Sequence, residues 1–99
     1  MLHNLKIQQT IIRVKKMEQI LDEVLDVLNT SPNSIKEDVA IREKVQQLIQ
    51  YYDGGEWLKD YECDERGELP IDLKRGVLAE DTLYNLFSDI KEIEDDKVM

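Results

Sequence analysis

The feature that most constrains the fold is an uninterrupted helical pattern over residues 5–29 of the 99-residue chain. Apolar residues recur there at steps of three and four positions, the spacing of one face of an α-helix. The central stripe consists of Ile7, Ile11, Val14, Met17, Leu21, Leu25 and Leu28, and Ile12, Ile20, Val24 and Val27 widen it. A stripe this wide suits a helix that packs against two partners. The helix would be about 37 Å long, so we expect one end to overhang or to meet a second subunit.

A turn cluster at 29–34 separates this helix from a second one, expected over about 35–52. Ser34 and Glu37 have the spacing of a capping box at the start of that second helix. The sequence Asp-Gly-Gly at 53–55 ends it. Because the connection is short, the two helices are expected to form an antiparallel hairpin.

The rest of the chain predicts one more long helix and an irregular connection to it. One further helical turn is expected at 56–61, an irregular segment at 62–76, and a last helix from 79 or 80. The polar tail at 94–99 is expected to fray. The predicted fold is therefore all-α, a single small helical domain over residues 1–99. It consists of an antiparallel helical hairpin plus a C-terminal helix, three main helices in all, with a long ordered loop between helices two and three.

Charge is distributed unevenly along the chain. There are 13 basic and 22 acidic residues, a net charge of −9. Residues 1–17 contain four basic residues and no acidic one, whereas residues 53–72 contain eight acidic residues and two basic ones. A chain this acidic repels phosphate backbones, so we expect no nucleic-acid partner. The basic start and acidic middle permit head-to-tail attraction between chains, and the long first helix favours a homodimer.

Several features predict a cytoplasmic protein. No apolar run approaches the about 20 residues that cross a bilayer, and no secretory signal is recognisable, so we expect no membrane contact. The single cysteine, Cys63, excludes an internal disulfide, which fits a reducing compartment. Its acidic neighbours Glu62 and Asp64 disfavour the thiolate, so Cys63 is a poor candidate for a nucleophile.

The stretch 51–81 is the most distinctive part of the sequence. It contains a Tyr-Tyr pair, a Trp, Asp-Tyr-Glu, Asp-Glu-x-Gly-x-Leu-Pro, and Leu-Lys-Arg-Gly-Val-Leu followed by Glu-Asp. With the pair Met17-Glu18, this pattern resembles a family of small bacterial proteins of about this length that is described only as a domain of unknown function. The resemblance implies a helical cytosolic protein with no known activity, and it supplies no catalytic or binding residues.

The aromatic residues of this stretch allow two interpretations. Tyr52, Trp57 and Tyr61 either close one end of the helical hairpin and anchor the loop to the core, or form an exposed patch that binds a partner. Large aromatic side chains bury enough area to fix a loop without regular structure. They are also favoured anchors in protein interfaces.

Arg75 is the expected counter-charge of the acidic loop. We predict that it pairs with one or more of Asp60, Asp64 and Asp81, because its planar fork can hold a carboxylate through two hydrogen bonds. Residues 64–67 have the pattern of a type I turn with Gly67 at its end, and Pro70 keeps the chain extended. Gly76 indicates either a positive φ or a close backbone contact.

No motif predicts an enzyme or a bound cofactor. Asp60, Glu62 and Asp64 alternate as the first ligands of a calcium loop do, but Glu65 and Ile71 stand where such a loop needs glycine and glutamate. The leading hypothesis is a non-enzymatic cytosolic module that binds a protein partner through the loop 53–76. Two alternatives stay open: metal binding or small-molecule handling by the acidic loop, and an acidic DNA mimic. The candidate interaction or structural residues are Tyr52, Trp57, Asp60, Tyr61, Asp64, Gly67, Pro70, Arg75, Gly76 and Asp81.

Overall fold

The structure is a computed structural model that describes the backbone of residues 2–95 and the side chains of residues 5–95. Its elements are α1 (Leu2–Thr30), α2 (Ser34–Glu37), α3 (Val39–Asp53), α4 (Glu56–Glu65), the 3-10 turn η1 (Gly76–Leu78) and α5 (Thr82–Asp95). No strand occurs between residues 2 and 95, so the predicted all-α class is confirmed. Five α-helices replace the three main helices that the sequence predicts. Within this described part, no helix has the length and apolarity needed to cross a membrane.

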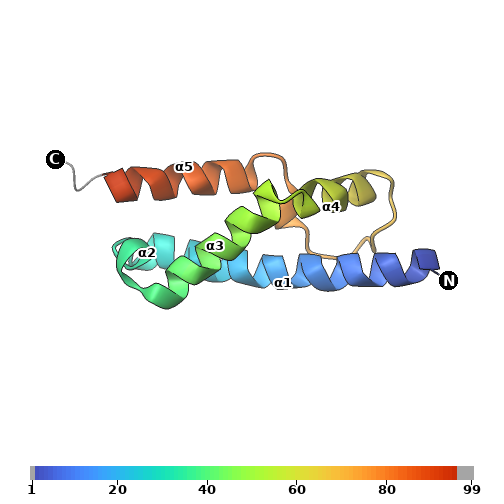
Figure 1. Ribbon diagram of the computed structural model, residues 1–99, viewed down its shortest axis with the longest axis horizontal. Coiled ribbons are helices and arrows are strands. Elements are labelled where there is room, and N and C mark those ends of the chain that lie inside the picture. The colour runs from blue at the N-terminus through green and yellow to red at the C-terminus, as the bar shows by residue number, and fades with distance from the viewer. Residues whose placement is uncertain (1, 96–99) are drawn as a thin grey trace.

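Helix α1 forms one side of an elongated molecule that measures 54 × 22 × 20 Å (Figure 1). Its buried stripe of Val14, Met17, Leu21 and Val24 follows the predicted spacing of three and four residues. The first turns extend past α4 in Figure 1, and Leu5 there is 60% exposed. One end of α1 therefore overhangs the bundle.

The predicted second helix is broken into two at Asp38. This residue has an extended backbone, with φ −86° and ψ 115°. Its carboxylate accepts hydrogen bonds from the backbone N–H groups of Ala40 at 2.9 Å and Ile41 at 3.4 Å, which caps α3. The predicted capping box is wrong, because Ser34 lies inside the one-turn helix α2 and no side chain caps that helix.

Helix α4 corrects the interpretation of residues 56–76. It continues to Glu65, beyond the single turn that was expected, so the long ordered loop predicted over 53–76 starts only at Arg66. The helix ends in a Schellman motif in which Gly67 adopts a φ of +74°. The Gly67 N–H donates to the Asp64 carbonyl at 2.9 Å and the Glu68 N–H to the Cys63 carbonyl at 3.2 Å. The turn expected at 64–67 is thus the end of a helix with its glycine cap.

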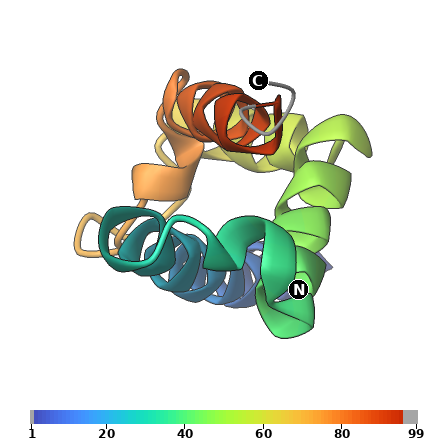
Figure 2. The ribbon, with the colours of Figure 1, turned by 90° about the vertical axis from the view of Figure 1, so that its left-hand side faces the viewer.

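The helices surround a common core, as the view along the long axis shows (Figure 2). Helix α3 runs back toward the amino-terminal side of α1, so the expected hairpin is formed by α1 and α3 with α2 between them (Figure 1). The turn η1 contacts α1, α4 and α5, and its Val77 and Leu78 are buried. The non-helical connection is therefore part of the core.

Helix α5 begins at Thr82, later than the start at 79 or 80 that the sequence predicts, so Glu80 and Asp81 precede the helix. Its buried face consists of Leu83, Leu86 and Ile90. The helix includes residues 94 and 95 of the expected tail, and residues 96–99 lie outside the described part.

Candidate functional site

Asp60 is a fully buried acidic residue held by two other helices. It lies on α4 and accepts hydrogen bonds from Nε of Arg13 on α1, at 2.9 Å, and from the hydroxyl of Tyr51 on α3, at 2.7 Å. Arg13 Nη2 donates to its second oxygen. A buried carboxylate is tolerated only when it is paired and hydrogen-bonded. This arrangement joins α1, α3 and α4 at one point, and the predicted Asp60–Arg75 pair does not form.

The protonation states of this cluster suit a structural role. Burial, together with the hydrogen bond to Asp60, raises the pKa of Tyr51 well above its ordinary value. The hydrogen bond to Asp60 likewise raises the pKa of Arg13. Tyr51 therefore remains a hydrogen-bond donor and Arg13 remains a cation at neutral pH.

Glu18 fixes the turn η1 against α1. Its side chain is buried on α1 and accepts a hydrogen bond from the backbone N–H of Val77. The carbonyl of Val77 accepts a hydrogen bond from Nε1 of Trp57 at 2.9 Å. A Cβ added to Gly76 would come within 3.3 Å of Glu18 Oε1, so this glycine allows a close approach and does not supply a positive φ. The N–H and the carbonyl of Val77 are thus bound by side chains from α1 and α4.

Arg75 holds the segment 66–76 in a fixed conformation. Of the three partners expected for it, the structure pairs Arg75 with Asp64. The same guanidinium donates to the backbone carbonyls of Pro70, of Ile71 at 3.3 Å and of Leu73 at 3.1 Å. One side chain therefore binds three carbonyls of the loop and a carboxylate of α4. Asp81 is exposed and has no contact with Arg75 among the described residues.

The aromatic residues form a stack that is half buried. Trp57 lies against Tyr61 with the ring planes inclined by 18° and the centroids 5.1 Å apart. The centroid of the Tyr52 ring lies 5.1 Å from that of Trp57 and 5.9 Å from that of Phe87 on α5. The Tyr61 hydroxyl donates to Glu80 at 2.6 Å, and this bond raises the pKa of Tyr61 to about 12. The geometry supports the anchoring interpretation for Trp57, whose ring packs against the core.

Ile71 is a candidate contact residue of this segment that the sequence did not predict. Its side chain is 98% exposed, although the chain on both sides of it is held in place. An open groove of about 310 Å³ lies beside it. The groove is lined by Ile11, Lys15, Pro70, Asp72, Leu73 and Lys74. The signal in the sequence was an aliphatic residue between Pro70 and Asp72, in a segment without helical periodicity.

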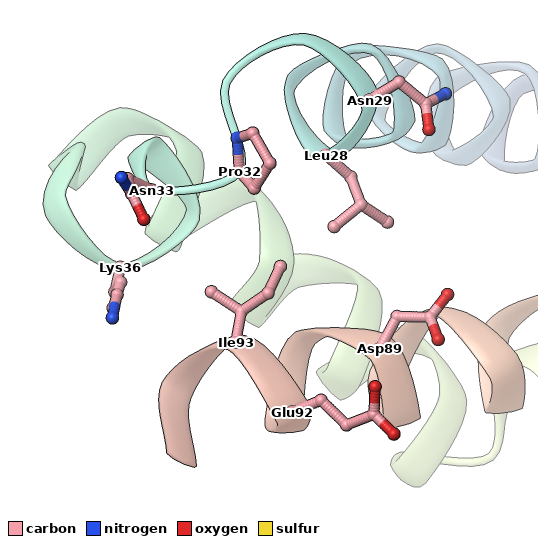
Figure 3. A pocket seen from close by; sticks show the side chains of 8 residues that line it. All are labelled: Leu28, Asn29, Pro32, Asn33, Lys36, Asp89, Glu92 and Ile93. Atoms are coloured by element: carbon pink, nitrogen blue, oxygen red, sulfur yellow. The ribbon is translucent and has the colours of Figure 1, made fainter. Parts of the chain in front are cut away.

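A second open groove, of about 520 Å³, lies at the other end of the molecule. Leu28 of α1 and Ile93 of α5 point toward each other across it, and polar side chains surround them (Figure 3). No sequence pattern indicates this groove, because the turn after α1 and the end of α5 are far apart in the chain. Its polar side chains do not converge on one point, so it offers no evident catalytic arrangement (Figure 3).

The acidic residues of α4 do not converge on a metal site. Alternate positions of a helix point in different directions, and Asp60 and Asp64 are paired with Arg13 and Arg75. Among the described residues there is no group of three or more His, Cys, Asp or Glu side chains that could hold a metal ion. Burial, followed by a hydrogen bond with Glu68, raises the pKa of the Cys63 thiol. That shift keeps the thiol protonated and poorly reactive.

The chain matches a known protein family over most of its length. The model of a family described as a domain of unknown function, DUF4298, matches residues 14–98. No curated protein and no solved structure matches the chain.

Proposed function

Since the chain belongs to the DUF4298 family of unknown function, we propose from its own surface that it is a non-enzymatic protein-interaction module of the cytosol. The contact surface is the segment 66–76 with the adjoining part of α1. This surface is smaller than the loop 53–76 that the sequence suggests. The observation that carries the proposal is the exposure of Ile71 on a segment whose backbone is held by Arg75.

A rigid segment with an exposed aliphatic side chain is suited to binding. Ile71, at 98% exposure, contributes almost nothing to the core, so its apolar area can be buried only by another molecule. Arg75 has already fixed the backbone around it. A partner that covers Ile71 would therefore lose less conformational entropy than one that must order a mobile loop.

The internal hydrogen bonds support a non-enzymatic role. The buried carboxylates among residues 5–95 are Asp60 and Glu18. They are engaged by Arg13, Tyr51 and the Val77 amide. A general acid or base needs a free position within reach of a substrate. Cys63 is buried with a raised pKa, which fits a reduced thiol in the cytosol.

The test is affinity capture from a lysate of the source cells with immobilised wild type and two variants. Ile71→Ser removes the exposed apolar side chain, and Val39→Ser is the matched control. Val39 is another β-branched aliphatic residue, 64% exposed, at the start of α3. We expect the proteins retained by wild type and by Val39→Ser to be lost by Ile71→Ser.

Circular dichroism melting curves of the three proteins establish that each is folded. Equal retention of the same proteins by Ile71→Ser and wild type would contradict the proposal. Retention that is lost equally in both variants would contradict it as well, because the loss would then not be specific to this surface.

A further inference from the structure

We infer that the surface around Ile71 is self-complementary and that its partner is a second copy of this chain, bound across a two-fold axis. The inference rests on the proposed function and names the partner of that surface. In a two-fold interface the same patch lies on both sides, so it must present both a projection and a recess that receives it. Ile71 is the projection, and the groove of about 310 Å³ beside it is the recess.

The apolar residues are arranged as such an interface requires. Ile71 stands between Pro70 and Asp72, which themselves line the groove, so the projection and the recess adjoin. Ile11 and Leu73 give the groove apolar walls. When Ile71 of each copy enters the groove of the other, both side chains are removed from water by one set of contacts.

Two unpaired charges at the groove provide complementary contacts. Lys15 and Asp72 both line it, and neither forms an ion pair with any other residue in the described part of the chain. A two-fold axis that seats Ile71 in the opposite groove brings Lys15 of one copy to the side of Asp72 of the other. Two equivalent pairs of opposite charge then flank the apolar contact.

The overall charge distribution favours pairing through this end of the molecule. Segments 5–16 and 56–75, which Figure 1 shows together at the amino-terminal side, hold eight of the 13 basic residues and seven of the 22 acidic ones. The remainder of the chain therefore carries the large negative charge. Pairing through the nearly balanced end keeps the two acidic ends apart and so limits the repulsion between them. Of the six large hydrophobic side chains that are exposed among residues 5–95, four also belong to these segments: Leu5, Ile12, Leu58 and Ile71.

The test is sedimentation equilibrium over a range of protein concentrations with single and compensating charge variants. Wild type and Val39→Ser are expected to approach twice the chain mass of 11.6 kDa as concentration rises. Ile71→Asp is expected to remain a monomer. Lys15→Asp and Asp72→Lys should each weaken the dimer about tenfold, since each places like charges opposite one another at two equivalent points. The double variant Lys15→Asp with Asp72→Lys should restore the wild-type dissociation constant.

A dimer that Ile71→Asp does not dissociate, or one that the double variant does not restore, would overturn the inference. A wild type that is monomeric at every concentration would overturn it too. The capture experiment separates the two proposals. If a monomeric protein still retains other proteins through Ile71, the proposed function stands and only the second copy as partner is wrong. If capture is also independent of Ile71, both are wrong.

Discussion

At the scale of single residues, two buried carboxylates organise the molecule. Asp60 joins three helices through Arg13 and Tyr51, and Glu18 binds the backbone of η1. Each is buried and hydrogen-bonded, so the energetic cost of removing it comes mainly from the partners left unpaired.

Replacing Asp60 with alanine tests whether this buried carboxylate stabilises the fold. The change leaves the Arg13 guanidinium and the Tyr51 hydroxyl without their acceptor. The Arg13 side chain is 25% exposed, so water partly solvates it after Asp60 is removed. We therefore expect the free energy of unfolding, measured with urea, to fall by about 3 kcal/mol, the lower end of the range for a broken buried ion pair. The control is Glu62→Ala, an exposed position of the same helix, which should change that free energy by less than about 0.5 kcal/mol. Equal effects of the two substitutions would contradict the account.

The hydrogen bond between Tyr61 and Glu80 predicts a delayed ionisation. It raises the pKa of Tyr61 to about 12 from the ordinary 10.0, because the carboxylate favours the protonated phenol. Since the folded state binds this proton more tightly than the unfolded state, the contribution to stability is present below pH 10 and is lost as the pH rises through 12. Absorbance at 295 nm, compared between wild type and Tyr61→Phe, should give a difference curve with a midpoint near pH 12. A midpoint at pH 10 would show that the bond is absent in solution.

At the scale of elements, short polar signals decide where the helices begin and end. Asp38 divides the expected second helix, and Gly67 ends α4. Trp57 then joins α4 to η1 through the Val77 carbonyl and to Tyr52 of α3, whose ring meets Phe87 of α5. The positions of α4 and of the segment 66–76 thus depend on a few side chains.

Comparing Asp38 with Ser34 tests the helix boundary directly. Asp38→Ala removes two hydrogen bonds to the first turn of α3 and should cost about 1 kcal/mol of unfolding free energy. Ser34→Ala should cost far less, because that hydroxyl caps nothing in this structure. Thermal or urea unfolding measures both. A larger loss for Ser34→Ala would restore the capping box that the sequence suggested.

Trp57 tests whether η1 is attached to α4. Trp57→Ala removes a ring that packs against the core, Tyr52 and Tyr61, and leaves the Val77 carbonyl without its donor; we expect a loss of about 3 kcal/mol. Trp57→Phe keeps an aromatic ring and should cost about 1 kcal/mol less than alanine. Urea unfolding distinguishes them. A loss below about 1 kcal/mol for Trp57→Ala would favour the exposed-patch interpretation instead.

The sequence predicted what depends on local pattern and missed what depends on distant contacts. The apolar period of α1 and the Asp-Gly-Gly stop at 53–55 are local signals, and both appear where expected. The Arg75–Asp64 pair could be predicted because few basic residues lie near the acidic stretch 53–72 in the sequence. By contrast, Arg13 and Asp60 are 47 positions apart, and Glu18 and Val77 are 59 apart. No periodicity reports such pairs, so the true partner of Asp60 could not be chosen from the sequence.

At the scale of the whole molecule, the chain forms a narrow helical body, and the connection between α4 and α5 covers one side of it. That segment is held by Glu18, Trp57 and Arg75 and presents Ile71 to solvent. Both the proposed binding function and the two-fold pairing are favoured by a segment that is rigid before any partner arrives. A mobile segment could still bind, but it would lose the advantage of a prearranged backbone.

The most direct measurement of this claim is the backbone ¹⁵N order parameter of residues 66–78 in the isolated protein. We expect values of about 0.85, equal to those of the flanking helices α4 and α5. Values below about 0.6 across this segment would show a mobile loop and would contradict the account.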